Sequence, residues 1–170
     1  MSADFPTIAE ASSLIAEKKL SPVELTQACL DRIARLDGTL HAFLRVTEES
    51  ALVMARAAEA AIMKGAPKGP LHGIPIGLKD IFNTKGIATT GHSRQLATNV
   101  PDEDSTWTRL LAEAGTVLLG KLATHEFAFG GPAFDLPWPP ARNPCLPMGM
   151  AWLLLLAGDV AGAASIGPLD

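Results

Sequence analysis

Residues 69–91 read GPLHGIPIGLKDIFNTKGIATTG, an apolar stretch broken by glycine and proline in which one lysine, Lys79, follows a run of isoleucine and leucine. Six of the fifteen glycines lie between residues 65 and 91, which predicts short buried strands joined by tight turns. Lys79 and Asp80 stand together at the end of one such strand. The lysine is either a solvated strand end beside a carboxylate or, if buried, a base that can accept a proton near neutral pH.

The chain before this stretch carries strong helix signals. Ser21 and Glu24 have the spacing of a capping box, and Pro22 occupies the first helical position. Apolar residues then recur near the helical period, which predicts a helix over 22–37 with one face on a core. Gly38 is expected to end this helix.

Other elements are indicated by composition and by turn-forming residues. Thr7 and Glu10 repeat the capping-box spacing near the N-terminus. We further expect a short strand at 40–46, a helix at 48–64, a helix that begins after Asp104 and ends at Gly115, and a buried strand at 116–119. Strand, helix and strand alternate, so the fold class is α/β.

Composition limits the classes of function. A chain of 170 residues suits one domain, and a net charge of −4 argues against general attraction to nucleic acid or to an anionic membrane. The longest uncharged apolar run, residues 148–157, is too short to cross a bilayer. The N-terminus has no secretory signal and the two cysteines, Cys29 and Cys145, have no pairing pattern, so we expect a cytoplasmic protein.

Metal and cofactor sites are not indicated. The four histidines, His41, His72, His92 and His125, lack the spacing of metal ligands on one helical turn. The glycines around Lys79 match neither the dinucleotide nor the P-loop pattern. We therefore expect no metal and no cofactor, and a small neutral or polar ligand as the partner.

Seven short motifs, in order along the chain, resemble those of the amidase signature family of serine hydrolases. They are GPLHGIPIGLKD at 69–80, TKG at 84–86, TTG at 89–91, EAG at 113–115, LLGK at 118–121, HEFAFGG at 125–131 and RNP at 142–144. Known members are considerably longer. The resemblance implies that residues 1–144 are the N-terminal part of an amidase signature domain, a mixed sheet flanked by helices, in a truncated chain.

The same resemblance implies a reaction, the hydrolysis of the C–N bond of a small-molecule amide. In the family, the lysine that matches Lys79 is the base of a Ser, cis-Ser, Lys triad. The neutral lysine accepts a proton from the bridging serine, which takes one from the nucleophilic serine as an acyl-enzyme forms. The residues that bind the substrate stay unassigned, although the segment at His125 and Glu126 is expected near the substrate cleft.

The chain departs from the family directly after residue 144. The family carries a glycine- and serine-rich loop there, whereas residues 145–158 read CLPMGMAWLLLLAG, and no serine occurs between Ser105 and Ser165. Ser165 and Ile166 match the neighbourhood of the family nucleophile only faintly. Residues 145–170 are therefore interpreted as a divergent apolar tail. We expect this chain to be inactive as a serine amidase and to self-associate through exposed apolar surface.

The leucine run has two competing explanations. Trp152 is encoded by TGG, and leucine can be encoded by CTC, so reading one base later gives glycine followed by serines. We hypothesise a disruption of the reading frame between residues 144 and 152. The alternative is a short natural variant in which leucines 153–156 pack as a terminal helix.

Three functions stay open from the sequence. The first is a stand-alone amidase. The second is that of the amidotransferase A subunit, which belongs to the same family and releases ammonia from glutamine for a partner. The third is a catalytically dead fragment or interaction module.

Overall fold

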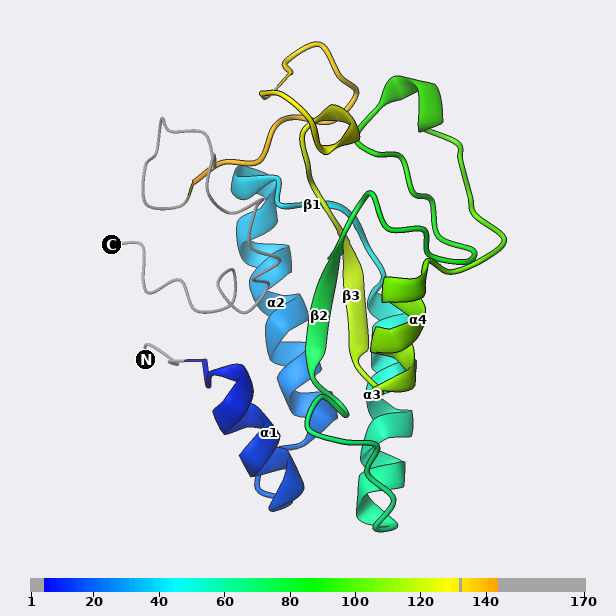
Figure 1. Cartoon of the computed structure of the whole chain (residues 1–170). Coiled ribbons are helices and arrows are strands. Elements are labelled where there is room, and N and C mark those ends of the chain that lie inside the picture. The colour runs from blue at the N-terminus through cyan, green and yellow to red at the C-terminus, as the bar shows by residue number, and fades with distance from the viewer. Residues whose placement is uncertain (1–4, 132, 144–170) are drawn as a thin grey trace.

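The structure is a computed structural model, and it describes residues 5–131 and 133–143 (Figure 1). The helices are α1 (Ile8–Ala16), α2 (Pro22–Leu40), α3 (Glu48–Met63) and α4 (Thr106–Glu113), and the strands are β1 (Phe43–Val46), β2 (Pro75–Lys79) and β3 (Val117–Leu122). Two short 3₁₀ helices lie at Arg94–Leu96 and Glu126–Ala128. None of the helices in this described part is long and apolar enough to span a membrane.

The three strands form one sheet in the order β1-β3-β2. β3 pairs antiparallel with β1 and parallel with β2, so the sheet is mixed. The register of β2 and β3 shifts by one residue at Leu119, the position of a bulge. This arrangement confirms the predicted α/β class with a mixed sheet and helices around it.

Helices α2 and α3 pack against each other and against the sheet (Figure 1). The resulting core joins Leu30 of α2 and two alanines of α3, Ala51 and Ala55, to Val117 and Leu119 of β3. Alanine on α3 lets the helix approach the central strand closely, since no long side chain intervenes. A second core cluster packs α1 against α2, α3 and the residue before β2: it contains Ala11, Ile15, Leu25, Ile62 and Ile74.

The predicted helix starts are confirmed by their caps. Thr7 and Glu10 form a reciprocal capping box at the start of α1. The Ser21 hydroxyl accepts hydrogen bonds from the backbone N–H groups of Val23 and Glu24 at the start of α2. Both helices therefore begin where a short polar side chain satisfies the free N–H groups of the first turn.

The prediction that Gly38 ends α2 is wrong. The helix continues to Leu40, and His41 takes the left-handed conformation that ends it, with φ 51°. The Asp37 carboxylate accepts hydrogen bonds from the N–H groups of Ala42 and Phe43, at 2.7 and 3.1 Å. These bonds fix the exit from the helix and offset the cost of about 1 kcal/mol for glycine within it. The strand expected from residue 40 consequently begins at Phe43.

Three further boundaries differ from expectation. Ser105, not Asp104, caps α4, because the Asp104 carboxylate instead accepts the N–H of Lys85 at 2.6 Å. β3 runs on to Leu122, three residues beyond the expected strand. Residues 65–91 contain the single strand β2 rather than several, and the rest is held by turns and an isolated bridge between Thr84 and Ile87.

Candidate active site

Lys79 is the last residue of β2 and lies opposite Leu122, the last residue of the parallel strand β3. The carboxyl ends of parallel strands meet at one edge of a sheet, which is where α/β proteins commonly place their ligands. Side chains alternate between the faces of a strand, so Lys79 points to the face opposite that of the buried Leu78. Lys79 itself is half-buried. Its ammonium group makes no hydrogen bond or ion pair with the described residues.

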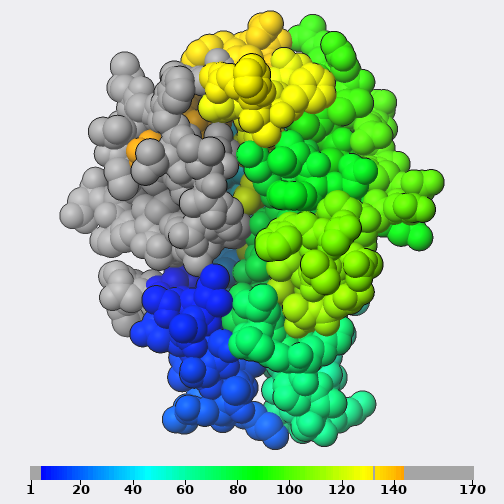
Figure 2. Space-filling model, in the orientation of Figure 1, coloured from blue at the N-terminus to red at the C-terminus, as the bar shows by residue number. Residues whose placement is uncertain are grey.

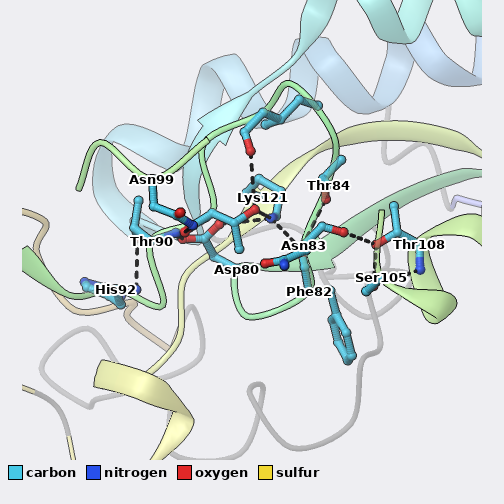
Figure 3. A network of polar contacts seen from close by, with 12 residues as sticks. Asp80, Phe82, Asn83, Thr84, Thr90, His92, Asn99, Ser105, Thr108 and Lys121 are labelled. Atoms are coloured by element: carbon cyan, nitrogen blue, oxygen red, sulfur yellow. Dashed lines mark hydrogen bonds and ion pairs between the residues drawn. The ribbon is translucent and has the colours of Figure 1, made fainter. Parts of the chain in front are cut away.

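Asp80, directly after Lys79, forms a buried ion pair with Lys121 of β3. The Lys121 Nζ and the Asp80 Oδ1 are 3.2 Å apart, and the two side chains are 0% and 1% exposed. Figure 3 shows this pair at the centre of a network of polar contacts. The contact is an ion pair without hydrogen-bond geometry at Oδ1, since that oxygen has no hydrogen-bond partner among the described residues.

The remaining polar atoms of the pair are satisfied by the loop after β2. The Asp80 Oδ2 accepts hydrogen bonds from the backbone N–H and the hydroxyl of Thr90, at 2.8 and 2.6 Å. The Lys121 Nζ donates to the carbonyl oxygen of Phe82 at 2.8 Å and to the hydroxyl of Thr89 at 2.7 Å. The pair thus holds both ends of the loop from residue 80 to 90 against the strand ends.

Burial lowers the pKa of Lys121 below its usual value, and the neighbouring Asp80 carboxylate opposes that change. Removing two charges from water costs several kcal/mol per ion, which the mutual attraction offsets only when further hydrogen bonds satisfy both groups. Here Thr89, Thr90 and the Phe82 carbonyl supply those bonds. The network is therefore a rigid and specific support beneath the end of β2.

A second set of contacts ties the same loop to its neighbours (Figure 3). The Asn83 carbonyl oxygen accepts hydrogen bonds from the Ser105 N–H and the Thr108 hydroxyl, which attaches α4. The Asn99 side-chain amide donates to the Thr89 carbonyl oxygen at 2.9 Å. The segment after β2 is consequently held on several sides.

The segment after β3 contacts the loop at residues 91–93. The Ser93 hydroxyl donates to the Glu126 carboxylate at 2.7 Å, and the Phe127 N–H donates to the Gly91 carbonyl oxygen at 2.8 Å. In Figure 2 the two segments, coloured green and yellow, touch on the upper part of the molecule. Glu126 therefore lies beside the loop that Asp80 anchors, while the predicted place of His125 and Glu126 in a substrate cleft stays a prediction.

Several candidate residues from the sequence contribute nothing further at this edge. Among residues 5–131 and 133–143, no group of three or more histidine, cysteine, aspartate or glutamate side chains is arranged to hold a metal ion. Burial raises the pKa of the Cys29 thiol to about 11, which makes it a poor nucleophile. Ser165, Cys145 and the leucine run lie outside the described residues.

Sequence reasoning does not find the role of Lys121 or of the two threonines. It identifies Lys121, Thr89 and Thr90 only as members of family-like motifs. The available signal is a lysine in an otherwise apolar strand, because a charge inside a buried strand needs a partner. Nothing in the spacing of the sequence identifies Asp80, 41 positions before Lys121, as that partner.

Known proteins resemble this chain in sequence and in structure. The amidase family model matches residues 24–148. The chain is 48% identical over 136 residues to the glutamyl-tRNA(Gln) amidotransferase A subunit of Salinispora arenicola (strain CNS-205), an alignment that covers 80% of this chain and 28% of that protein. The chain therefore belongs to the amidase family, the amidase signature enzymes.

Two further matches extend the comparison. The corresponding protein of Myxococcus xanthus (strain DK1622) is 42% identical over 165 residues, which cover 92% of this chain and 34% of that protein. This alignment includes residues beyond 148, where the family model ends. The native peptide amidase of Stenotrophomonas maltophilia has a similar structure, with a TM-score of 0.67 and 37% identity over 71% of this chain and 25% of that one. The chain thus spans about 28% of the length of the first curated relatives.

Proposed function

We propose that Lys79 is the general base of an amide-hydrolysing site of the Ser, cis-Ser, Lys type. One observation carries this proposal: two lysines stand at the same edge of the sheet in opposite environments. Lys121 is buried and committed to Asp80, whereas the ammonium group of Lys79 has no partner among the described residues. A base must be free to exchange a proton with a reacting group, and of these two lysines only Lys79 meets that requirement.

The proposed chemistry assigns Lys79 one task. In its neutral form it accepts a proton from a bridging serine, and that serine accepts the proton of the nucleophilic serine. The nucleophilic oxygen then attacks the amide carbonyl, the proton passes back to the leaving nitrogen, and water hydrolyses the acyl-enzyme. The Asp80–Lys121 pair supports this step by fixing the backbone next to Lys79.

We propose further that this chain does not hydrolyse amides by itself. No serine occurs between Ser105 and Ser165, so Lys79 has no bridging serine through which to act on a nucleophile. We place the boundary between the family-like part, residues 1–144, and the divergent segment, residues 145–170, at this departure. Loss of one member of such a catalytic unit costs several orders of magnitude in rate.

Inactivity is tested on the purified 170-residue chain. We expect no turnover of aryl amides or glutamine above that of the Lys79→Ala variant. A fluorophosphonate probe for activated serines is expected to leave the chain unlabelled, as it does a Ser165→Ala control. Saturable labelling of Ser165, or turnover that Lys79→Ala abolishes, would show that the chain is an active enzyme.

The role of Lys79 is tested in a chimera that restores the missing serines. Residues 1–143 are joined to the remaining part of the Salinispora arenicola protein, to which they are similar. We expect Lys79→Ala to lower the hydrolysis rate of this chimera by about 100- to 10,000-fold, the usual contribution of a general base. Lys85→Ala, at an exposed lysine of the same segment, is the matched control and should leave the rate unchanged. An active chimera that tolerates Lys79→Ala would refute the assignment.

A second candidate function is that of the amidotransferase A subunit. The observation that favours it is the repeated similarity to proteins of that name, among them those of Salinispora arenicola and Myxococcus xanthus. Such a chain would release ammonia from glutamine for a partner protein. A complementary chimera with the remaining part of the Stenotrophomonas maltophilia peptide amidase would show whether residues 1–143 bias hydrolysis toward glutamine or toward peptide amides. The quantity compared is the ratio of glutamine hydrolysis to peptide-amide hydrolysis. If this ratio in each chimera equals that of the parent enzyme that supplied the remaining part, residues 1–143 carry no such preference.

A further inference from the structure

The segment between α3 and β2, residues 64–74, leads into the strand that ends at Lys79 (Figure 1). It contains His72, which is 5% exposed. The proposed hydrolysis gives this histidine no task, and it belongs to no metal-binding group among residues 5–131 and 133–143. It is thus a buried titratable side chain at the start of β2 whose role its own contacts must explain.

One ring nitrogen of His72 accepts a hydrogen bond from the backbone of its own segment. The N–H of Lys68 donates to the His72 Nδ1 at 3.0 Å. The backbone N–H of His72 in turn donates to the carbonyl oxygen of Gly69 at 3.1 Å, so the two bonds close the turn over residues 68–72. An imidazole nitrogen that accepts a hydrogen bond carries no proton, and the proton of the neutral ring is therefore on Nε2.

The ring of His72 packs against the turn that joins α4 to β3. A Cβ atom at Gly115 would overlap with the ring, so glycine leaves the room that the imidazole fills. Gly115 also has a φ of 82°, in the left-handed region that favours glycine. Beside the ring, the Gly73 N–H donates to the Gly115 carbonyl oxygen and the Val117 N–H to that of Ile74, both at 2.9 Å. His72 thus lies where the parallel pairing of β2 and β3 begins.

No carboxylate is placed to stabilise a positive charge on this ring. Among the described residues, no aspartate or glutamate forms an ion pair with His72. The charged side chains of the surrounding elements are Glu24 near the start of α2, Glu59 and Lys64 toward the end of α3, Lys68 in the segment itself, and Arg109 and Glu113 in α4. Glu59 accepts a hydrogen bond from the Ser21 hydroxyl, Glu113 is paired with Arg109, and Glu24 is exposed.

Burial, and after it the positive charge of Lys68, lower the pKa of His72 below its usual value. The folded chain consequently binds fewer protons at this residue than a state in which the ring is released to water. As the pH falls below the ordinary histidine value of about 6.5, the released state is therefore stabilised relative to the folded one. Protonation also turns Nδ1 from an acceptor into a donor that faces the N–H of Lys68.

We propose that His72 is an acid-operated latch: protonation of its Nδ1 breaks the hydrogen bond from the Lys68 N–H and releases residues 64–72 from the start of β2. At neutral pH the latch holds this segment against the turn at Gly115. In acid the segment opens while the core formed by α2, α3 and β3 stays folded. The latch depends on the contacts around His72 and not on the proposed hydrolysis.

Hydrogen exchange of the Lys68 amide, followed by NMR and expressed relative to its intrinsic rate, tests the latch. Between about pH 7.5 and about pH 5.5 its protection should fall several-fold, up to about tenfold, the limit set by the ordinary pKa of a released histidine. In His72→Asn, the uncharged Oδ1 replaces Nδ1 as the acceptor, so protection should not change with pH. His41→Asn, at the end of α2, removes a histidine outside the segment and should keep the pH dependence of the parent chain.

Three results would overturn the proposal. The first is Lys68 protection that is constant with pH in the parent chain, and the second is a pH dependence that persists in His72→Asn. The third is equal protection of the Lys68 amide and of the Ala55 amide in the core, because the opening would then be global unfolding.

The parent chain decides by itself if His72→Asn does not fold. The chemical shift of the Lys68 amide should follow the titration of the His72 ring, with a midpoint below about 6.5. A Lys68 shift that does not respond to this titration would refute the latch.

Discussion

The carboxyl edge of the sheet and an apolar groove between α1, α2 and the starts of β1 and β2, lined by Leu25, Leu36 and Phe43 among others, are built from opposite chemistry. At the edge, Asp80 and Lys121 are buried charges whose remaining polar atoms are satisfied by the loop after β2. In the groove, mostly apolar side chains of α1, α2 and the strand starts line an open hollow. Hydrogen bonds are directional, whereas apolar contact is not. Contacts at the edge therefore fix the side chains there in one arrangement, whereas the contacts along the groove do not require one.

Lys79 and Lys121 show the same contrast within the edge itself. The two residues are one register position apart in neighbouring strands, since Leu78 lies opposite Lys121 and Lys79 opposite Leu122. Lys121 is fully buried and paired, and Lys79 is half-buried and unpaired among the described residues. Position near a strand end thus does not distinguish the two lysines. The distinction between them, on which the proposed role of Lys79 rests, is whether the ammonium group is committed to other residues.

The largest expected loss of stability comes from removing the Asp80–Lys121 ion pair at the sheet edge. In Asp80→Ala, Lys121 is left buried without a counter-charge, so the free energy of unfolding should fall by about 3–5 kcal/mol. Lys79→Ala, the matched control one position before it, should lower it by less than about 1 kcal/mol, because no ion pair or hydrogen bond with the described residues is lost. Urea unfolding followed by circular dichroism measures both. Equal effects of the two substitutions would contradict the distinction between the two lysines. The combined change Asp80→Leu with Lys121→Met should recover most of the lost stability.

A substitution in the apolar wall of the groove should lower the free energy of unfolding somewhat less. Leu25 is 7% exposed and belongs both to the core cluster beneath α1 and to the groove wall. Leu25→Ala should lower the free energy of unfolding by about 2–5 kcal/mol, through lost burial and a larger cavity. Val53→Ala on α3, at a residue 62% exposed, should change it by less than about 0.5 kcal/mol. Thermal unfolding provides the measurement, and a Leu25→Ala chain as stable as the control would place Leu25 outside the core.

The hydroxyl group of Thr90 is expected to contribute to the stability of the loop after β2. Thr90→Val removes the donor to the Asp80 Oδ2 and the acceptor for the His92 N–H, contacts of 2.6 and 3.0 Å. The free energy of unfolding should fall by about 1–3 kcal/mol, because the partners stay buried. Thr98→Val, at an exposed position, is the control and should have little effect. Hydrogen exchange of the Thr90 and His92 amides should accelerate only in the first variant. Unchanged protection there would mean that the hydroxyl does not hold the loop.

The smallest expected effect is a dependence of stability on alkaline pH. Burial lowers the pKa of Lys121, so the folded chain binds fewer protons than the unfolded chain between that lowered pKa and the ordinary lysine value of about 10.4. The free energy of unfolding must therefore rise with pH in this window. Because Lys121→Met removes this contribution, the stability of the parent chain relative to this variant should increase as the pH approaches about 10.4. A difference that is constant with pH would show that Lys121 has an ordinary pKa.

Much of the local structure could be predicted because its causes are local. A capping residue, a proline at the first helical position and an apolar period lie within a few residues of one another, as at Ser21 and Pro22. Two boundaries were predicted wrongly because a carboxylate binds groups that the helix signals do not reveal. The Asp37 carboxylate binds the N–H groups of residues 42 and 43, beyond the expected helix end at Gly38. The Asp104 carboxylate binds the N–H of Lys85, 19 positions earlier, so Ser105 caps α4.

Residue order and apolar patterns are enough to predict the family, the α/β class and the position of Lys79 at a strand end. The printed sequence also shows that no serine follows within the expected loop. Which of the two lysines is unpaired among the described residues depends instead on how the strands pack. Asp80 and Lys121 are brought together by the parallel pairing of β2 and β3, and pairing between distant strands is set by the burial of the whole sheet rather than by neighbouring residues. The groove between α1 and α2 has the same origin, because it exists only once helices and strands are packed.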